Sequence, residues 1–138
     1  MAQPVLAVLA IVIRGGEVLL VRRKNEPDAG LWGFPGGRLE YGETLQEGAC
    51  RELLEETGVS AKAHRFLDLQ EVIKPPLPGQ DQPAFHYVLA GIQCIYEAGE
   101  PVADDDALDA RFVPFDTVFD ADLPLCDRVG ELLCKALK

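Results

Sequence analysis

The chain has 138 residues, and its 23 acidic against 13 basic side chains give a net charge of −10. This length predicts a single domain, residues 1–138, that buries a core without disulfide or metal staples. The negative balance argues against a DNA or RNA polymer as partner, because nonspecific nucleic-acid binding needs clustered Lys and Arg. The four cysteines are scattered and form no CxxC pair, so the pattern indicates neither a zinc site nor a redox motif.

The first half of the chain predicts a β-hairpin followed by a helix. Residues 5–13 are a continuous apolar, β-favouring run, Gly15-Gly16 marks a tight turn, and residues 17–22 form a second strand. The lack of polar alternation in the first strand indicates a sheet covered on both faces. A loop at 24–42 precedes a helix at 44–57.

The second half predicts two more long strands and a second helix. Strands are expected at 66–73 and 85–96, with a bulge at Gly91, and the proline-rich segment 74–84 between them is expected to be irregular. An acidic loop at 100–109, a short strand at 111–114 and a helix at 124–137 complete the chain. Strands interrupted by two helices predict an α/β fold, namely an α/β/α sandwich with a central mixed sheet. No apolar run is long enough to span a bilayer, so we expect a cytoplasmic protein with no membrane partner.

The helix at 44–57 carries three carboxylates in its last two turns. Thr44 and Glu47 have the spacing of a capping box, and Gly58 is placed as a helix stop. The other glutamates, Glu52, Glu55 and Glu56, fall on one arc, with Glu56 at the edge of the apolar sector. Acidic groups are disfavoured at a helix C-terminus, whereas hard divalent cations prefer oxygen ligands. Arg51, four residues before Glu55, is placed to pair with it.

These residues belong to a longer pattern. Gly37, five residues, Glu43, seven residues and then the run Arg51-Glu52-Leu53-Leu54-Glu55-Glu56-Thr57-Gly58-Val59 resemble a complete Nudix box. The resemblance implies the Nudix-type sandwich and hydrolysis of a diphosphate bond assisted by Mg²⁺ or Mn²⁺. It also implies metal binding by Glu52, Glu56 and Glu55, the last directly or through water, and an extra ligand from the Gly36 or Gly37 carbonyl.

Several roles stay open at this point. Glu52 is the first choice for the base that activates water, with Glu56 as the alternative. Asp105, within the run of aspartates at 104–106, is a candidate metal ligand, although such a run also simply keeps a loop solvated. Arg51 is expected to orient Glu55 or Glu43 rather than to bind substrate.

Substrate-binding candidates flank the helix. Arg22 and Arg23 end a strand where an arginine could fork onto a phosphate, or simply face water. The glycines Gly36 and Gly37 let the backbone approach a ligand. The aromatic residues that could stack on a base, or belong to the core instead, are Trp32, Phe34, Phe85 and Tyr87.

Pro75 lies sixteen residues beyond Val59, a placement similar to that in Nudix ADP-ribose pyrophosphatases. We therefore expect a small-molecule nucleoside diphosphate derivative as substrate, with ADP-ribose split into AMP and ribose 5-phosphate. One alternative is a pyrophosphohydrolase that removes modified nucleoside triphosphates. Another is a non-catalytic module that senses ADP-ribose or a nucleotide. Homodimers are common among similar proteins, so that assembly state stays open.

Overall fold

A computed structural model describes residues 3–104 and 106–138. The chain forms ten helices and strands within these residues. In order they are β1 (Val5–Arg14), β2 (Glu17–Arg23), β3 (Trp32–Gly33), β4 (Gly36–Arg38), α1 (Leu45–Thr57), β5 (Ser60–Lys74), β6 (Phe85–Ala98), β7 (Ala107–Pro114), α2 (Phe115–Phe119) and α3 (Val129–Ala136).

The described strands form one mixed sheet, which confirms the predicted fold class. Its main order is β3-β2-β1-β6-β5, while β4 pairs with β1 and β7 pairs with β2. The β1–β6 pair is parallel and the other pairs are antiparallel. The apolar run of β1 therefore lies at the centre, where a strand buried on both faces reads as a continuous hydrophobic stretch.

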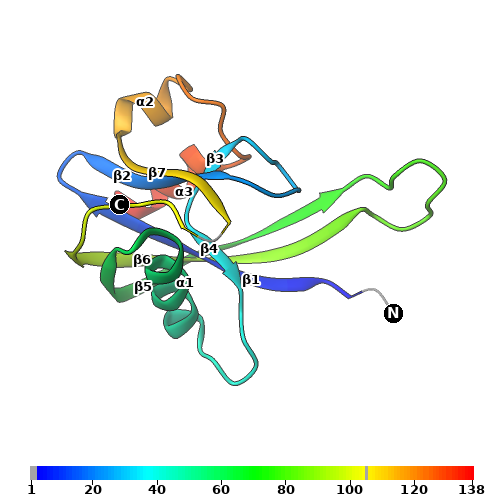
Figure 1. Cartoon of the computed structure of the whole chain (residues 1–138), viewed down its shortest axis with the longest axis horizontal. Helices are drawn as coiled ribbons and strands as arrows, with labels where there is room; N and C mark the ends of the chain where they lie inside the picture. Colours follow the sequence, from blue (N-terminus) through cyan, green and yellow to red (C-terminus); the bar gives the residue numbers. More distant parts are fainter. Residues whose placement is uncertain (1–2, 105) are drawn as a thin grey trace.

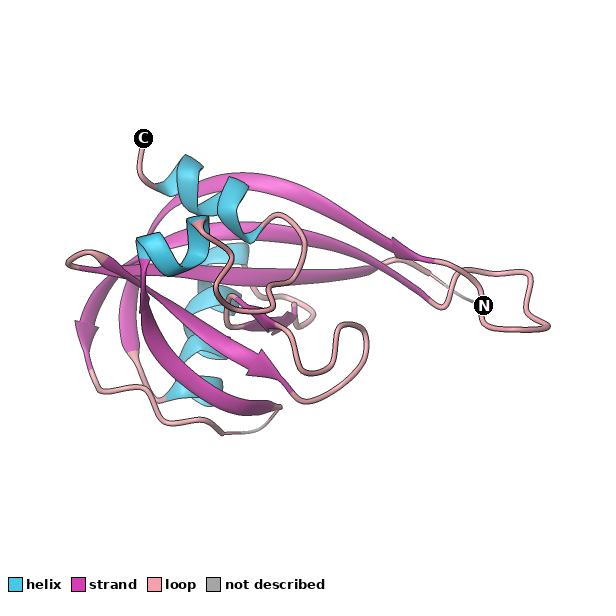
Figure 2. Cartoon of the chain, turned by 90° about the horizontal axis from the view of Figure 1, so that it is seen from above, coloured by secondary structure: helices cyan, strands magenta, loops and turns pink. Residues whose placement is uncertain are grey.

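Each face of the sheet has its own hydrophobic core. The first core joins Ile11 and Leu20 to Leu132 and Leu133 of α3. The second lies under α1 and is built from residues such as Leu53 of the helix and Val8 of β1. Figure 1 shows α1 on one side of the sheet and α2 with α3 on the other, and Figure 2 gives the same arrangement from above. The two helical layers confirm the expected sandwich.

The ends of α1 are fixed by local hydrogen bonds. The Thr44 hydroxyl accepts from the Glu47 amide, and the Glu47 carboxylate accepts from the Thr44 amide, which is the predicted capping box. Gly58 ends the helix in the left-handed conformation, with φ of 75°. The loop after β6 returns to this end, where the Val102 amide donates to the Thr57 carbonyl and the Asp104 amide to the Glu56 carbonyl.

The structure departs from several predicted boundaries. The short strands β3 and β4 lie inside the segment predicted as a loop, because they gain their stability from pairing with β2 and β1 rather than from their own length. Strand β5 starts at Ser60, and its pairing with β6 shifts register at three places. The shift between Phe66 and Asp68 lies opposite Ile92 and Gly91, so the pairing is irregular at Gly91 as predicted, with the extra residue on β5. Gly91 leaves room for α3, since a Cβ there would lie 2.9 Å from the Leu132 side chain.

The C-terminal part of the chain also differs from the prediction. Helix α3 starts at Val129, not at 124, and Arg128 before it has a φ of 66°, which breaks the helical path. The short helix α2 was not predicted. Cys94 is buried, whereas Cys134 is exposed.

Strands β5 and β6 extend beyond the rest of the sheet as a two-stranded arm (Figure 1). The proline-rich segment 75–84 forms the irregular connection at its tip, as predicted. Near its base the arm supplies one wall of the pocket described below. Among the described residues, no helix combines the length and apolar character needed to cross a bilayer.

Candidate functional site

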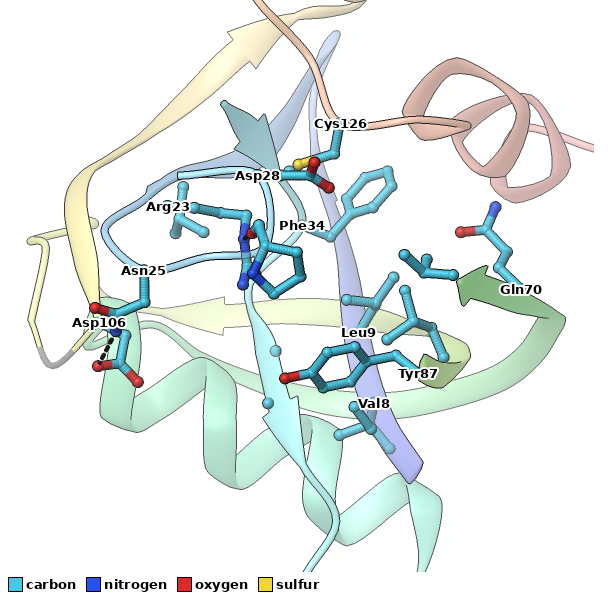
Figure 3. A pocket seen from close by; sticks show the side chains of 18 of the residues that line it. Val8, Leu9, Arg23, Asn25, Asp28, Phe34, Gln70, Tyr87, Asp106 and Cys126 are labelled. Carbon is cyan, nitrogen blue, oxygen red and sulfur yellow. Dashed lines mark hydrogen bonds between the residues drawn. The ribbon is translucent and has the colours of Figure 1, made fainter. Parts of the chain in front are cut away.

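A pocket of about 520 Å³ lies at the junction of the sheet, α1 and the loop that follows β2. Residues from β1, β4, β5, β6 and α1 line it, together with the segment that leads into α3. Figure 3 shows the side chains that converge on it, with Asp106 at one side of the view and Gln70 at the other. The carboxylate helix and the glycines of β4 therefore face the same cavity.

Glu56 lies on the inner face of α1, where its side chain lines the pocket. It is only 7% exposed, because it shares the buried stripe of the helix with Ala49 and Leu53. Burial raises the pKa of Glu56 to about 8, and the negative charges of Glu52 and Asp106 act in the same direction. A backbone hydrogen bond from Gly36 and the charge of Arg23 act against this rise. A half-buried acid was predicted here, and the structure buries it more deeply.

Glu52 lines the same pocket, one helical turn before Glu56. Its carboxyl group lies against Gly37, where an added Cβ would be 2.6 Å from the Glu52 Cδ atom. Gly36 is constrained by the backbone instead, since a Cβ there would overlap the Val8 carbonyl oxygen. The two adjacent glycines thus have different tasks: Gly36 permits the pairing of β4 with β1, and Gly37 makes room for the Glu52 carboxylate.

Arg51 is the centre of a carboxylate network on the outer side of α1. Its guanidinium donates two hydrogen bonds to Glu43, at 2.6 and 2.9 Å, and further bonds to Glu52 at 2.9 Å and Glu55 at 3.2 Å. It also donates to the Arg38 carbonyl. The hydrogen bond from Arg51 lowers the pKa of Glu43 to about 2, with help from a backbone bond.

Glu55 differs from its two neighbours. Its side chain is 47% exposed, forms the predicted ion pair with Arg51, and is not among the residues that line the pocket. The expected arc of three glutamates is therefore divided between two environments, with two carboxylates in the pocket and one outside it.

The end of β2 supplies one of the two candidate arginines to the pocket. Arg23 lines it and donates a hydrogen bond to the Pro27 carbonyl at 2.8 Å. Arg22 is exposed, does not line the pocket, and donates to the Gly30 carbonyl at 3.1 Å. Alternation along the strand explains the difference, since adjacent side chains point to opposite faces.

Of the two described members of the aspartate run, Asp106 lines the pocket and Asp104 does not. Asp105 lies outside the described residues. Asp106 lines the pocket, where it accepts a hydrogen bond from the Asn25 side chain at 3.0 Å. Three consecutive aspartates offer no sequence signal that separates them, because the register of the loop depends on the backbone bond from Lys24 to the Asp106 carbonyl.

Two of the four candidate base-stacking residues line the pocket and two do not. Phe34 and Tyr87 line the pocket (Figure 3). Trp32 is a core residue, 4% exposed, with the Arg111 guanidinium over its ring. Phe85 stacks on Tyr87 but is not among the lining residues, and neither is Pro75.

Sequence reasoning did not select several polar residues in the pocket wall. The pocket is also lined by Gln70, Lys74, Asp28, Cys126 and Asp127. Lys74 and Asp28 form an ion pair at 3.0 Å that joins β5 to the loop after β2. Burial raises the pKa of the Cys126 thiol to about 11, so this cysteine is a thiol rather than a nucleophilic thiolate at neutral pH. A single Gln or Lys on a long strand carries no motif that distinguishes it.

The pocket carboxylates fit a divalent cation that substrate helps to hold. Within the described residues, no three acidic, histidine or cysteine side chains are grouped as a ready-made metal site. Mg²⁺ in phosphate-processing sites commonly uses one or two carboxylates together with substrate phosphates and water. Glu52 and Glu56 supply such a pair, and a cation would offset both the burial of Glu56 and its repulsion by Glu52.

Comparison with known proteins places this geometry in context. The family model described as NUDIX domain matches residues 3–133. The ADP-ribose pyrophosphatase of Methanocaldococcus jannaschii is 36% identical over 109 residues, which are 79% of this chain and 61% of that protein. The chain thus spans about three-fifths of the length of that relative.

Solved structures share the fold. A MutT NUDIX hydrolase from Burkholderia pseudomallei superposes with a TM-score of 0.79 at 25% identity, covering 97% of this chain and 98% of that one. The NUDIX domain of Shewanella oneidensis NrtR, solved with ADP ribose, superposes with a TM-score of 0.77 at 24% identity, covering 99% and 88%.

Proposed function

Because this chain belongs to the Nudix hydrolase family, we propose that it hydrolyses the diphosphate bond of a nucleoside diphosphate linked to another moiety, with ADP-ribose as the substrate. The observation that carries the proposal is the pair Glu52 and Glu56, placed in one pocket beside Gly37 and Arg23. The similarity to an ADP-ribose pyrophosphatase supports the choice of substrate.

We assign the pocket residues as follows. Glu52 and Glu56 would hold Mg²⁺ or Mn²⁺, which when bound neutralises phosphate charge and lowers the pKa of water. Glu55, outside the pocket and paired with Arg51, would act only through water. Asp106, which faces the same cavity, takes the place of the undescribed Asp105 as the aspartate that we assign to the site.

The protein groups then position the substrate. Arg23, fixed by its bond to the Pro27 carbonyl, would donate hydrogen bonds to a phosphate oxygen. Glu52, held by Arg51 and supported against Gly37, is our candidate to accept the proton of the attacking water. Phe34 and Tyr87 offer aromatic surface to the group at the other end of the diphosphate.

Product analysis tests the proposal. Purified protein with Mg²⁺ should convert ADP-ribose to AMP and ribose 5-phosphate, measured by chromatography and mass spectrometry. A sanitising enzyme would instead convert a modified nucleoside triphosphate to a monophosphate and pyrophosphate. A binding module would hold ADP-ribose without turnover at micromolar protein concentration. Either of the last two results in place of AMP and ribose 5-phosphate contradicts the proposal.

A thermal measurement tests the ligand assignment independently of turnover. Mg²⁺ should raise the melting temperature of the wild-type protein, because a ligand that binds only the folded state stabilises it. The rise should be much smaller in the Glu52→Gln/Glu56→Gln double variant and close to wild type in Glu55→Gln. An equal rise in all three proteins would place the cation elsewhere.

A further inference from the structure

Gln70 on β5 is a polar side chain in the pocket wall that the proposed chemistry does not use. It is 7% exposed. Among residues 3–104 and 106–138, no hydrogen-bond partner is found for its side-chain amide. Every fully buried side-chain nitrogen or oxygen atom in these residues has a partner, so the Gln70 amide atoms are not fully buried. The Gln70 amide therefore keeps some contact with solvent, and its residue lines both the main pocket and a smaller neighbouring hollow.

Gln70 has apolar neighbours on the sheet, while Lys74 and Asp127 line the pocket with it. The register puts Leu89 of β6 directly opposite Gln70, and Tyr87 opposite Val72. Leu9 of β1 lines the same wall, and Figure 3 shows it between Phe34 and Tyr87. The apolar side chains of Leu9, Val72 and Leu89 offer a surface for the face of a flat ring, and the Gln70 amide lies beside them where it could meet the polar edge of that ring.

Gln70 lies on the opposite side of the pocket from Asp106 (Figure 3). The charge of Asp106 acts on Glu56. An extended substrate whose diphosphate reached Glu52 and Glu56 would direct one of its end groups toward Gln70. A base and a diphosphate in the same molecule would thus occupy opposite ends of this pocket.

We propose that Gln70 is a specificity-determining residue that reads the edge of a purine base. This inference rests on the proposed function for the identity of the substrate. The carboxamide would accept a hydrogen bond from the 6-amino group of adenine and donate one to a neighbouring ring nitrogen. An amide suits this edge because it presents a donor and an acceptor side by side.

Binding measurements on a matched pair of ligands test the proposal. AMP and purine riboside 5′-monophosphate differ only in the 6-amino group, and calorimetry gives their affinities without turnover. Wild type should bind AMP about 5- to 100-fold more tightly, the range expected for a paired amide contact with a base. The near-isosteric change Gln70→Met should reduce this preference to about onefold.

Gln93→Met is the matched control. Gln93 lies on β6, where its side chain accepts a hydrogen bond from Arg65 at 2.7 Å and donates one to the Ala136 carbonyl at 3.3 Å, and it does not line the pocket. This variant should melt at a lower temperature and keep the preference for AMP. Equal affinity of wild type for both ligands, or an equal loss for both in Gln70→Met, would overturn the proposal.

A measurement on the wild-type protein tests the proposal even if Gln70→Met does not fold. In ¹⁵N-labelled protein, the side-chain amide signal of Gln70 should shift with AMP and shift far less with the analogue. No difference between the two ligands would count against the assignment. Selective AMP binding through Gln70 without hydrolysis of ADP-ribose would refute the proposed function alone, and hydrolysis of ADP-ribose without base selectivity would refute this inference alone.

Discussion

The outer and inner sides of α1 give the same functional group opposite properties. Glu43 lies outside the pocket, where a two-pronged contact with Arg51 lowers its pKa to about 2. Glu56 lies inside, where burial and the nearby charge of Glu52 raise its pKa to about 8. On the outer side a guanidinium contacts Glu43 through two hydrogen bonds, whereas on the inner side burial and like charge dominate at Glu56. The comparison shows how the side of the helix on which a carboxylate lies sets the direction of its pKa shift.

The largest expected effect comes from removing the inner carboxylate. Glu56→Gln should lower kcat/KM for ADP-ribose on the order of 10³-fold, because several kcal/mol of transition-state stabilisation depend on a metal ligand. The matched change on the exposed side, Glu55→Gln, should cost less than about tenfold. Steady-state kinetics in Mg²⁺ measure both, and equal losses would mean that the two sides of α1 do not differ in function.

The pH dependence of stability separates the two environments without a substrate. With EDTA present, the raised pKa of Glu56 means that the folded protein holds a proton which the unfolded chain releases between about pH 4.5 and pH 8. The stability contributed by the protonated group is complete below this window and is lost as the pH rises. At neutral pH the loss is on the order of 3 kcal/mol.

Urea denaturation at several pH values measures this loss. Glu56→Gln should flatten the profile between about pH 5 and pH 8 and be more stable than wild type at neutral pH. Glu43 acts in the opposite sense, since its lowered pKa means that stability falls as the pH drops from about 4.5 toward 2. A variant that melts much earlier than wild type in EDTA would make Glu56 a structural residue.

Adding one methyl group at each glycine of β4 tests the side of α1 that faces the pocket. Gly37→Ala would place a Cβ against the Glu52 carboxyl group, so activity should fall about 10- to 100-fold while the fold survives, as misplacement of a reacting group does. Gly36→Ala would collide with the Val8 carbonyl oxygen and should reduce stability and soluble yield. Circular dichroism and kinetics together distinguish the two outcomes.

The smallest effect should come from the outer network. Arg51→Lys keeps the charge but loses the planar fork that holds Glu43, so we expect about a tenfold loss of activity, in the lower range for residues that orient ligands. The loss should appear in kcat more than in KM, because Arg51 does not line the pocket. A change confined to KM would instead indicate direct contact with substrate.

Local patterns predicted the helix with its capping box, the long strands and the mixed sheet, because these depend on spacing within a few residues. Strands β3 and β4 were missed, since each is too short to show periodicity and is stabilised by distant partners. The same limit applies to the pocket. The box grouped Glu52, Glu55 and Glu56 together, whereas the separation of Glu55 from the other two depends on where Arg51 and the pocket lie.

Residues outside the box were harder to assign. The pocket position of Arg23 rather than Arg22 follows from strand alternation once the sheet is known. Gln70 and Asp106 reach the cavity through long-range pairing of β5 and through the loop before β7, and neither belongs to a motif. The sequence therefore predicted the kind of chemistry better than the shape of the cavity around it.

The loop after β6 has one more consequence for the end of α1. The last carbonyl groups of the helix, at Glu56 and Thr57, receive main-chain amides from Asp104 and Val102, and no basic side chain occupies the final turn. A lysine at this position would be a tethered cation able to swing toward the neighbouring acids and compete with a diffusible one. Amides fixed in the peptide chain satisfy the same carbonyls, so the helix is terminated without a second cationic side chain beside Glu56.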